Sequence, residues 1–247
     1  MDHQSGQLSI ANSLPTAEPV PLFTKGLKRF NIFLLTETTL VTIAAILAIR
    51  LLATSSLSNA AWFVSPGILV AAALIPTAVR RREFPRFGFN IGQIGPTLLV
   101  VCRTCVVVFS ALFAGLWLLK SFGLGLPLQP VPPKEQGWVS WLFYQFMYVA
   151  VAEEVFFRGY VQSNILRLTN PGKGSQYRLW KWLSIMLSAA CFAVAHIIVL
   201  GRIISVLTFL PGLICGWLFI RTRSLLAPIL FHGLANTCYL ILAGVFT

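Results

Sequence analysis

The sequence predicts an all-α fold, a polytopic transmembrane helix bundle of about seven spans, with eight as the alternative count. Of its 247 residues, 57% are hydrophobic and only 11% are charged, whereas soluble domains carry about a quarter charged residues. The mean hydropathy is +0.79. The apolar residues also gather into segments near the ~20 residues that a helix needs to cross a bilayer. These observations favour a single transmembrane domain over residues 31–247.

Seven apolar segments follow one another along this domain, separated by short polar connections. Prolines lie at or near several segment ends, where transmembrane helices tolerate them because neighbouring groups satisfy the freed backbone. Residues 1–30 start polar and proline-spotted, without the apolar core of a cleavable signal, and we interpret them as a disordered cytoplasmic tail. The seven segments are 31–53, 60–79, 97–119, 138–160, 180–200, 203–220 and 224–246.

The placement of lysine and arginine predicts the orientation in the membrane. Thirteen basic residues fall in the tail and in alternate loops, against four in the loops of the other side. Because cytoplasmic loops retain basic residues, we expect a multi-pass protein of the cell (inner) membrane with a cytoplasmic N-terminus and an outer C-terminus. The scatter of these residues in short clusters also argues against nucleic acid as a partner. The thirteen are Lys25, Lys28, Arg29, Arg80, Arg81, Arg82, Arg86, Arg167, Lys173, Arg178, Lys181, Arg221 and Arg223.

Ionisable side chains inside the apolar segments are few and concentrated. Each charge near the bilayer centre opposes insertion by about 2.5–3.5 kcal/mol, so such residues usually serve a function. Counting ~1.5 Å of rise per helical residue places the groups from three different segments at overlapping depths. The pattern therefore predicts one shared site, made by Glu153, Glu154, Arg158, His196, His232 and the polar Asn236.

These residue types suit hydrolysis by an activated water. Glu154 and Arg158 are four residues apart and can pair on one helix face, which leaves Glu153 in a different environment as the candidate general base. His196 could share the water or carry its proton to the leaving amine. His232 and Asn236, again four residues apart, could donate hydrogen bonds to the oxyanion of a tetrahedral intermediate. No serine or cysteine stands in a nucleophile motif such as G-x-S-x-G.

Three motifs on separate segments resemble those of the CPBP intramembrane proteases, a family that includes the type II CAAX prenyl endopeptidases and the bacteriocin-processing and abortive-infection proteins. EEVFFRG, FAVAH and HGLAN resemble the EExxxR, FxxxH and HxxxN motifs of that family. The resemblance covers roughly residues 138–240, the expected catalytic core, and implies a glutamic-type intramembrane endopeptidase. CAAX-type members look more like eight-helix proteins. The resemblance implies that Glu153 and His196 activate water, that His232 and Asn236 form the oxyanion site, and that Glu154 and Arg158 support them.

The expected partners are the lipid bilayer and a membrane-associated or lipidated peptide or protein substrate. Nothing in the sequence selects between a prenylated C-terminus and a leader or bacteriocin peptide. The basic cytoplasmic loops could attract anionic lipid headgroups near a lateral opening. We therefore expect the substrate to reach the site from the cytoplasmic side, and we expect neither a metal nor another cofactor.

Other interpretations stay open at this point. Glu153, His196 and His232 are also residue types that bind zinc, although H-E-x-x-H is absent and the three lie on different helices. Buried acids also occur in transporters and proton relays, but no internal repeat accompanies them here. A non-catalytic membrane scaffold, or a structural ion pair in EEVFFRG, would need no chemistry at all.

Three further features are interpreted as structural. Glu37 has no visible partner in the sequence and is expected at the membrane interface or facing the bundle. Arg103 is expected to extend towards the cytoplasmic surface. The five cysteines all lie in apolar runs, and we expect them to be small core residues.

Overall fold

The structure, a computed structural model, describes residues 22–85, 91–124, 128, 137–168 and 175–246. Helices make up nearly all of these ranges, and no strand occurs within them. This is the expected outcome for so apolar a chain, because a single helix satisfies all its own backbone groups in lipid. The elements are α1 (Leu22–Thr54), α2 (Ser58–Val79), α3 (Ile91–Ser121), α4 (Gly137–Phe143), η1 (Tyr144–Ala150), α5 (Val151–Glu154), η2 (Val155–Gln162), α6 (Ser163–Leu168), α7 (Ser175–Leu200), η3 (Ile203–Thr208), α8 (Phe209–Thr222) and α9 (Leu226–Phe246).

Six helical segments in the described ranges are long and apolar enough to cross a membrane. They coincide with six of the seven predicted segments, so the predicted all-α transmembrane bundle is confirmed. The six are Asn31–Thr54, Ser58–Val79, Gln93–Ser121, Arg178–Leu200, Ile203–Thr222 and Leu226–Phe246.

The remaining predicted segment, 138–160, lies in a continuous helical run from α4 to α6 that is not uniformly α-helical. Two π-helical stretches, η1 and η2, stand on either side of the short helix α5. All eight residues of η2 are buried, Arg158 included. Stretches of π-helix are rare and occur frequently at functional sites, because the extra residue per turn changes where side chains point. The two π-helical stretches therefore make this run a candidate for the functional part of the protein.

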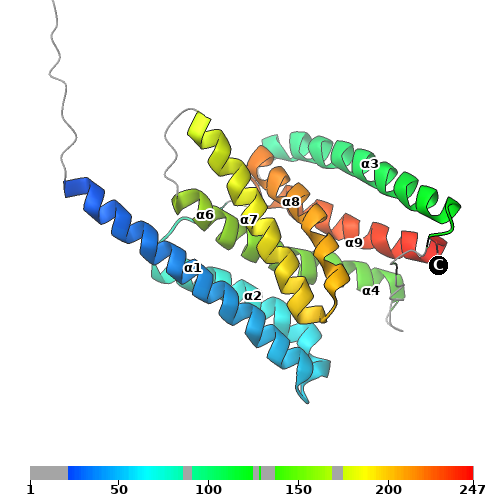
Figure 1. Ribbon diagram of the computed structural model, residues 1–247, viewed down its shortest axis with the longest axis horizontal. Coiled ribbons are helices and arrows are strands. Elements are labelled where there is room, and N and C mark those ends of the chain that lie inside the picture. The colour runs from blue at the N-terminus through cyan, green and yellow to red at the C-terminus, as the bar shows by residue number, and fades with distance from the viewer. Residues whose placement is uncertain (1–21, 86–90, 125–127, 129–136, 169–174, 247) are drawn as a thin grey trace, which may run out of the picture.

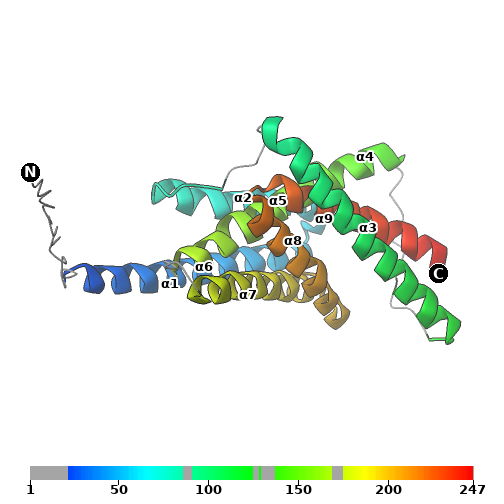
Figure 2. The ribbon, with the colours of Figure 1, turned by 90° about the horizontal axis from the view of Figure 1, so that it is seen from above.

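The central run is enclosed by helices on both sides (Figure 1). The helices α1 and α2 pack on each other along one flank, while α3 packs on α9 along the other. Both α2 and α7 contact η2, and α9 contacts η1. In Figure 2, which is seen from above, α3 crosses α9. The acids of α5 are thus held between helices that come from both halves of the chain.

Outward faces of the peripheral helices are apolar. On α3, Val106, Val107 and Trp117 are 67%, 68% and 60% exposed. Such a surface would be an aggregation-prone patch in a soluble protein, whereas in a bilayer it is the face that contacts lipid. Among the cysteines, Cys105 and Cys215 are buried as predicted, but Cys102 is exposed on α3 because that helix turns most of its surface outward.

Several boundaries differ from the sequence prediction. The helix α1 begins at Leu22, so residues 22–30 belong to a helix although they were assigned to the tail; residues 1–21 lie outside the described ranges. Likewise α3 begins at Ile91 rather than at 97, and α7 at Ser175 rather than at 180. In each case the helix continues past the apolar segment, because hydropathy marks the part that fits in lipid and not the end of the backbone hydrogen bonds.

Glu37, expected at the membrane interface or facing the bundle, faces the bundle with its side chain 12% exposed, and it has partners that the sequence did not make visible. Its carboxylate accepts two hydrogen bonds from Arg82, at 2.6 and 3.1 Å, and one from Arg80 at 3.2 Å. The hydroxyl of Tyr160 on η2 lies 3.4 Å from the same carboxylate. These partners are more than forty residues away along the chain. The folded arrangement alone brings them together, so the ion pair joins α1 to the end of α2.

Candidate active site

The candidate site residues come from three elements that pack around one point. Glu153 and Glu154 close the short helix α5, His196 lies on α7, and His232 lies on α9. A single helix could not bring these groups together, since the acids are more than forty residues from His196 and almost eighty from His232. The tertiary packing of α7 and α9 on the π-helical run does so instead.

Glu154 and Arg158 form a fully buried ion pair. Nη1 of Arg158 donates to Oε1 of Glu154 at 2.9 Å, with both side chains 0% exposed. Nη2 of Arg158 donates to the carbonyl oxygen of Gly212 on α8, also at 2.9 Å. The guanidinium lies 4.9 Å from the centre of the Phe192 ring. These contacts compensate for much of the desolvation cost that a buried charge carries.

The backbone of α8 can reach Arg158 because small residues line its contact with α7. A Cβ placed on Gly212 would meet Cβ and Cα of Ala189 at 3.2 and 3.3 Å. Close approach of backbones through small residues is the usual way that membrane helices pack. One turn later, Nε2 of Gln162 donates to the carbonyl oxygen of Gly216 at 3.1 Å. The polar face of η2 therefore binds α8 through two carbonyl groups that are one helical turn apart.

His232 is held by Glu154, the second of the two adjacent glutamates. Its Nδ1 lies 2.7 Å from Oε1 of Glu154. A carboxylate engaged by Arg158 can only accept, so Nδ1 carries the hydrogen. Consequently Nε2, the other ring nitrogen, is the one turned to Glu153, and it lies 3.6 Å from Oε2 of that residue. Glu154 thus sets both the tautomer and the direction of the His232 ring.

His196 is oriented in the same way by the backbone. Its Nδ1 lies 3.0 Å from the carbonyl oxygen of Phe192, one helical turn earlier. A carbonyl oxygen can only accept, so Nδ1 again carries the hydrogen, and Nε2 of the neutral ring is a free base. That nitrogen lies 3.9 Å from Oε2 of Glu153. The ring of Phe192 lies beside both histidines: its centre is 4.4 Å from the centre of the His196 ring and 5.7 Å from the centre of the His232 ring.

Glu153 stands where both histidines point. Its side chain is 19% exposed, while the Oε2 atom is itself buried and has no hydrogen-bond partner within the described part of the protein. Separations of 3.6 and 3.9 Å are too long for direct hydrogen bonds. They are short enough for a water molecule to interact with the carboxylate and an imidazole together. A carboxylate and two imidazole nitrogens therefore converge on one point.

Asn236 forms its hydrogen bond with η1, and that it shares a cavity with His232 stays a prediction. It lies one turn after His232 on α9, and its Nδ2 donates to Oε1 of Gln145 at 2.9 Å. Its contacts are thus to η1 and not to the acids. One hydrogen of the amide group remains available beyond the bond to Gln145. The structure brings Glu153, Glu154, Arg158, His196 and His232 together, and it places Asn236 beside them through Gln145.

Gln145 was missed in the sequence. A glutamine in an apolar segment, eight residues before Glu153, was a signal of the same kind as the acids, though weaker because an uncharged amide costs less to bury. The close packing of η1 on α9 explains its reach. A Cβ on Gly233 would lie only 2.5 Å from the ring of Phe146, so glycine alone lets the two segments approach this far.

One group of potential metal ligands occurs in the described residues. Ligand atoms of Glu154, Cys215 and His232 lie within 4.8 Å of one another, all buried. The hydrogen on Nδ1 of His232 occupies the position that a metal would need, and Arg158 already neutralises Glu154. This donor set fits an ion pair with hydrogen bonds better than a metal site. Glu153 and His196 are not members of the group.

Residues 135–238 match the family model described as type II CAAX prenyl endopeptidase Rce1-like. This segment, less than half of the chain, is similar to the Rce1-like family. The match includes all three motifs and confirms the resemblance inferred from the sequence. The six long apolar helices make the chain an integral multi-pass membrane protein, and its part from 135 to 238 is similar to a family of endopeptidases. No curated protein and no solved structure matches the chain significantly.

Proposed function

We propose that this protein is an intramembrane endopeptidase that hydrolyses a peptide bond with a water activated by Glu153 and His196. The observation that carries the proposal is the convergence of two imidazole Nε2 atoms on the unpartnered Oε2 of Glu153, at 3.6 and 3.9 Å. A buried carboxylate oxygen without a donor is costly to maintain for packing alone. An activated water supplies the donor that this oxygen lacks.

The chemistry follows from the orientation of each group. Glu153 takes one proton from the water while the water oxygen attacks the carbonyl carbon of the peptide bond. Nε2 of His196, which is free, accepts that proton from Glu153 and delivers it to the nitrogen of the leaving amine. The carbon–nitrogen bond then breaks, the products are a carboxylic acid and an amine, and both Glu153 and His196 return to their starting forms. The bond from His196 to the carbonyl oxygen of Phe192 keeps the basic nitrogen facing the water throughout.

Stabilisation of the oxyanion is assigned to His232 and Asn236. For His232 to donate from Nε2, its ring must carry two hydrogens, one on Nδ1 towards Glu154 and one towards the developing negative charge. Asn236 adds its remaining amide hydrogen, with Gln145 holding the group in place. A well-placed donor of this kind contributes about 3–4 kcal/mol to the transition state.

A zinc-dependent peptidase is the second candidate, and one observation favours it. Two histidines and a glutamate form the ligand set of several zinc peptidases, and here they converge. Against it, two ligands that are each about 2.0–2.2 Å from one zinc lie at most about 4.4 Å apart, whereas ligand atoms of Glu153, His196 and His232 do not form a group within 4.8 Å of one another. Glu154 and Arg158 then keep their supporting roles in either mechanism.

The substrate is inferred to be a membrane-associated peptide or protein, lipidated or not. The thirteen-to-four distribution of basic residues supports a cytoplasmic N-terminus in the inner membrane, with substrate and water reaching the site from the cytoplasmic side. Two of the seven acidic residues in the chain, Glu153 and Glu154, lie at the candidate active site within the bundle.

The experiment that tests the proposal compares membranes that carry the wild-type protein with membranes that carry Glu153→Gln. Terminal proteomics on both should find new N-termini only with the wild-type chain. Glutamine keeps the shape of the side chain but cannot take the proton. If the same new termini form with both proteins, Glu153 is not the base and the proposed mechanism is wrong.

A further inference from the structure

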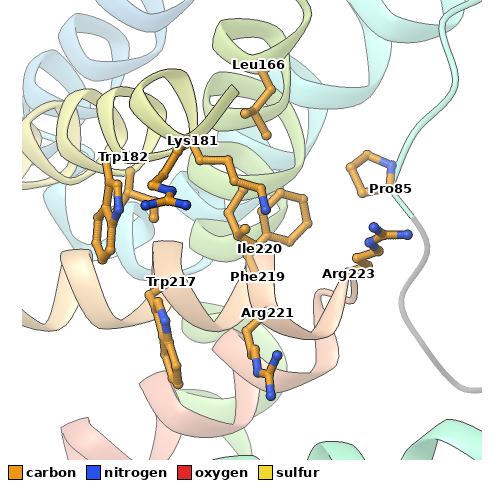
Figure 3. A pocket seen from close by; sticks show the side chains of 11 residues that line it. Pro85, Leu166, Lys181, Trp182, Trp217, Phe219, Ile220, Arg221 and Arg223 are labelled. Atoms are coloured by element: carbon orange, nitrogen blue, oxygen red, sulfur yellow. The ribbon is translucent and has the colours of Figure 1, made fainter. Parts of the chain in front are cut away.

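One cavity of the protein has a lining that includes none of the candidate active-site residues, so the peptidase chemistry does not use it. It has a volume of about 630 Å³ and lies between α7 and α8, next to the end of α6 and the segment that follows α2. Figure 3 shows side chains from both helices turned towards this space. Four of the lining residues are basic and none is acidic: Arg178, Lys181, Arg221 and Arg223.

The basic residues approach the cavity from two walls. On α7, Arg178 and Lys181 are three residues apart and therefore share a face of the helix. On the opposite wall, Arg221 lies in the last turn of α8 and Arg223 follows it. Retention of a loop in the cytoplasm requires only that basic residues be present in it, and not that they surround one space. Their convergence therefore calls for a ligand that is negatively charged.

The backbone at Arg223 strengthens this argument. It adopts φ 54° and ψ 32°, the left-handed conformation in which a helix usually ends with glycine. A side chain other than glycine is disfavoured there, and such positions are found where function requires them. The N–H of Arg223 donates to the carbonyl oxygen of Phe219 and closes the helix. An arginine at this position places a guanidinium on the cavity at the expense of an easier C-cap.

The opposite helix end gives a second electrostatic reason. Arg178 lies in the first turn of α7, which begins at Ser175. The amide groups at a helix N-terminus carry partial positive charge, so a basic side chain there is unfavourable and an anion is favourable. No ion pair joins Arg178, Arg221 or Arg223 to a carboxylate among the residues that the structure describes. An anion in the cavity would be attracted by both walls and by the end of α7.

The remaining lining residues indicate a lipid rather than a soluble anion. Trp182 and Trp217 flank the cavity and are 54% and 37% exposed, and tryptophan is enriched where a membrane meets water. The buried side chains of Ile185 and Phe219 form an apolar part of the same lining. A site with basic groups at the helix ends and apolar groups deeper in the bundle matches a molecule with a phosphate at one end and hydrocarbon at the other.

We propose that this cavity binds the phosphate headgroup of an anionic membrane lipid, with Arg178 and Lys181 on one wall and Arg221 and Arg223 on the other. The lipid enters from the surrounding bilayer at the level of the helix ends. Its glycerol and the first part of its acyl chains lie against the tryptophans. This site is independent of the proposed peptidase mechanism, because none of its lining residues has a role in that mechanism.

The chain itself offers a matched control for the test. The cavity variant is Arg221→Gln with Arg223→Gln, which removes one helical arginine and one in the left-handed conformation. The control is Arg103→Gln with Arg81→Gln, which also removes one arginine on a helix and one with positive φ, at 49°. Both variants lose two positive charges, but neither control residue lines the cavity. A second cavity variant, Arg178→Gln with Lys181→Gln, removes the other wall.

Binding is measured by native mass spectrometry of the full-length protein in detergent, titrated with phosphatidylglycerol or phosphatidylcholine. We expect at least tenfold tighter binding of phosphatidylglycerol by the wild-type chain. A basic residue near an anionic surface contributes about fivefold in binding, so each cavity variant should lose roughly 25-fold. The control should change less than threefold.

Three outcomes would overturn the proposal. Equal losses in the control and cavity variants would mean that only net charge attracts the lipid. Equal binding of the two lipids would show that the headgroup charge is not recognised. Displacement of phosphatidylglycerol by inorganic phosphate or by an acidic peptide at the same concentration would assign the cavity to that soluble anion instead. Circular dichroism and gel filtration of each variant establish that it is folded, and the two cavity variants are independent of each other.

Discussion

His232 and Glu154 meet through a hydrogen bond of 2.7 Å between Nδ1 and Oε1, although they are 78 residues apart in the sequence. Glu154 is also the ion-pair partner of Arg158, so one carboxylate holds both a guanidinium and an imidazole. This arrangement gives the two adjacent glutamates different tasks. Oε1 of Glu154 is engaged by both Arg158 and His232, whereas Oε2 of Glu153, like Oε2 of Glu154, has no hydrogen-bond partner among the described residues.

Replacement of Glu153 by glutamine should abolish activity without unfolding the protein. General-base catalysis is worth 10²–10⁴-fold, so we expect a loss of at least about a hundredfold in kcat/KM. Stability should hardly change, because Oε2 of Glu153 makes no hydrogen bond. Thermal unfolding and cleavage rates are measured together. The control is Glu37→Gln, which removes a carboxylate with three arginine contacts and should lower stability while cleavage continues.

Replacement of Glu154 by glutamine should damage both stability and activity. Removing one partner of a buried ion pair leaves the other charge uncompensated, at a cost of about 3–5 kcal/mol. The double variant Glu154→Gln with Arg158→Met removes both charges and should recover most of that stability. Activity should not return, because His232 has lost the carboxylate that fixes the tautomer and direction of its ring. Recovery of cleavage together with stability would show that the pair is structural only, and the cleavage rate at equal folded fraction decides this.

The contacts around the acids show which parts of the site were predictable. Spacing along a helix suffices for Glu154 with Arg158 and for Phe192 with His196, since local geometry alone fixes residues four apart. The common depth of the acids and histidines followed from the rise per residue, because straight spans in a bilayer of fixed thickness leave little freedom. Motifs on separate helices could therefore be placed at one level without any knowledge of the fold.

Other features depend on tertiary packing and had no local signal. The π-helical stretches η1 and η2 have compositions that fit an ordinary α-helix, so their backbone geometry could not be predicted from the sequence. In the structure they pack against α9 and α8. The partners of Glu37 come from another segment. The bond from Asn236 to Gln145 arises because Gly233 allows η1 and α9 to approach closely. Sequence spacing orders residues along one element but does not tell which neighbouring element lies opposite.

Activity should survive chelators if the water mechanism is correct. Incubation with o-phenanthroline followed by gel filtration should leave the cleavage rate within twofold of the untreated protein. Metal analysis of the purified protein should find well below one zinc per chain. Loss of activity that added zinc restores, with bound zinc in the active sample, would instead favour the second candidate, in which Glu153, His196 and His232 are ligands.

Gln145 should act through Asn236. Removing an oxyanion donor costs about 10²–10³ in kcat, so Asn236→Ala is expected to fall in that range. Gln145→Leu removes the acceptor that fixes the amide and should lower kcat about tenfold, whereas Gln145→Glu keeps an acceptor and should retain most of the rate. In the double variant the effects should not add, because both act through one group. A product of the two separate losses would mean that Gln145 acts independently of Asn236.

The predicted orientation can be tested at the two ends of α2. Ser56 precedes this helix and Glu83 follows it, and both are exposed. Because one helix separates them, they must lie on opposite faces of the membrane. Each is replaced by cysteine in a chain whose five native cysteines have been removed. With a cytoplasmic N-terminus, Ser56→Cys reacts with an impermeant maleimide in intact cells, and Glu83→Cys reacts only after the membrane is opened. The reverse pattern would invert the orientation, and with it the proposed entry of substrate from the cytoplasmic side.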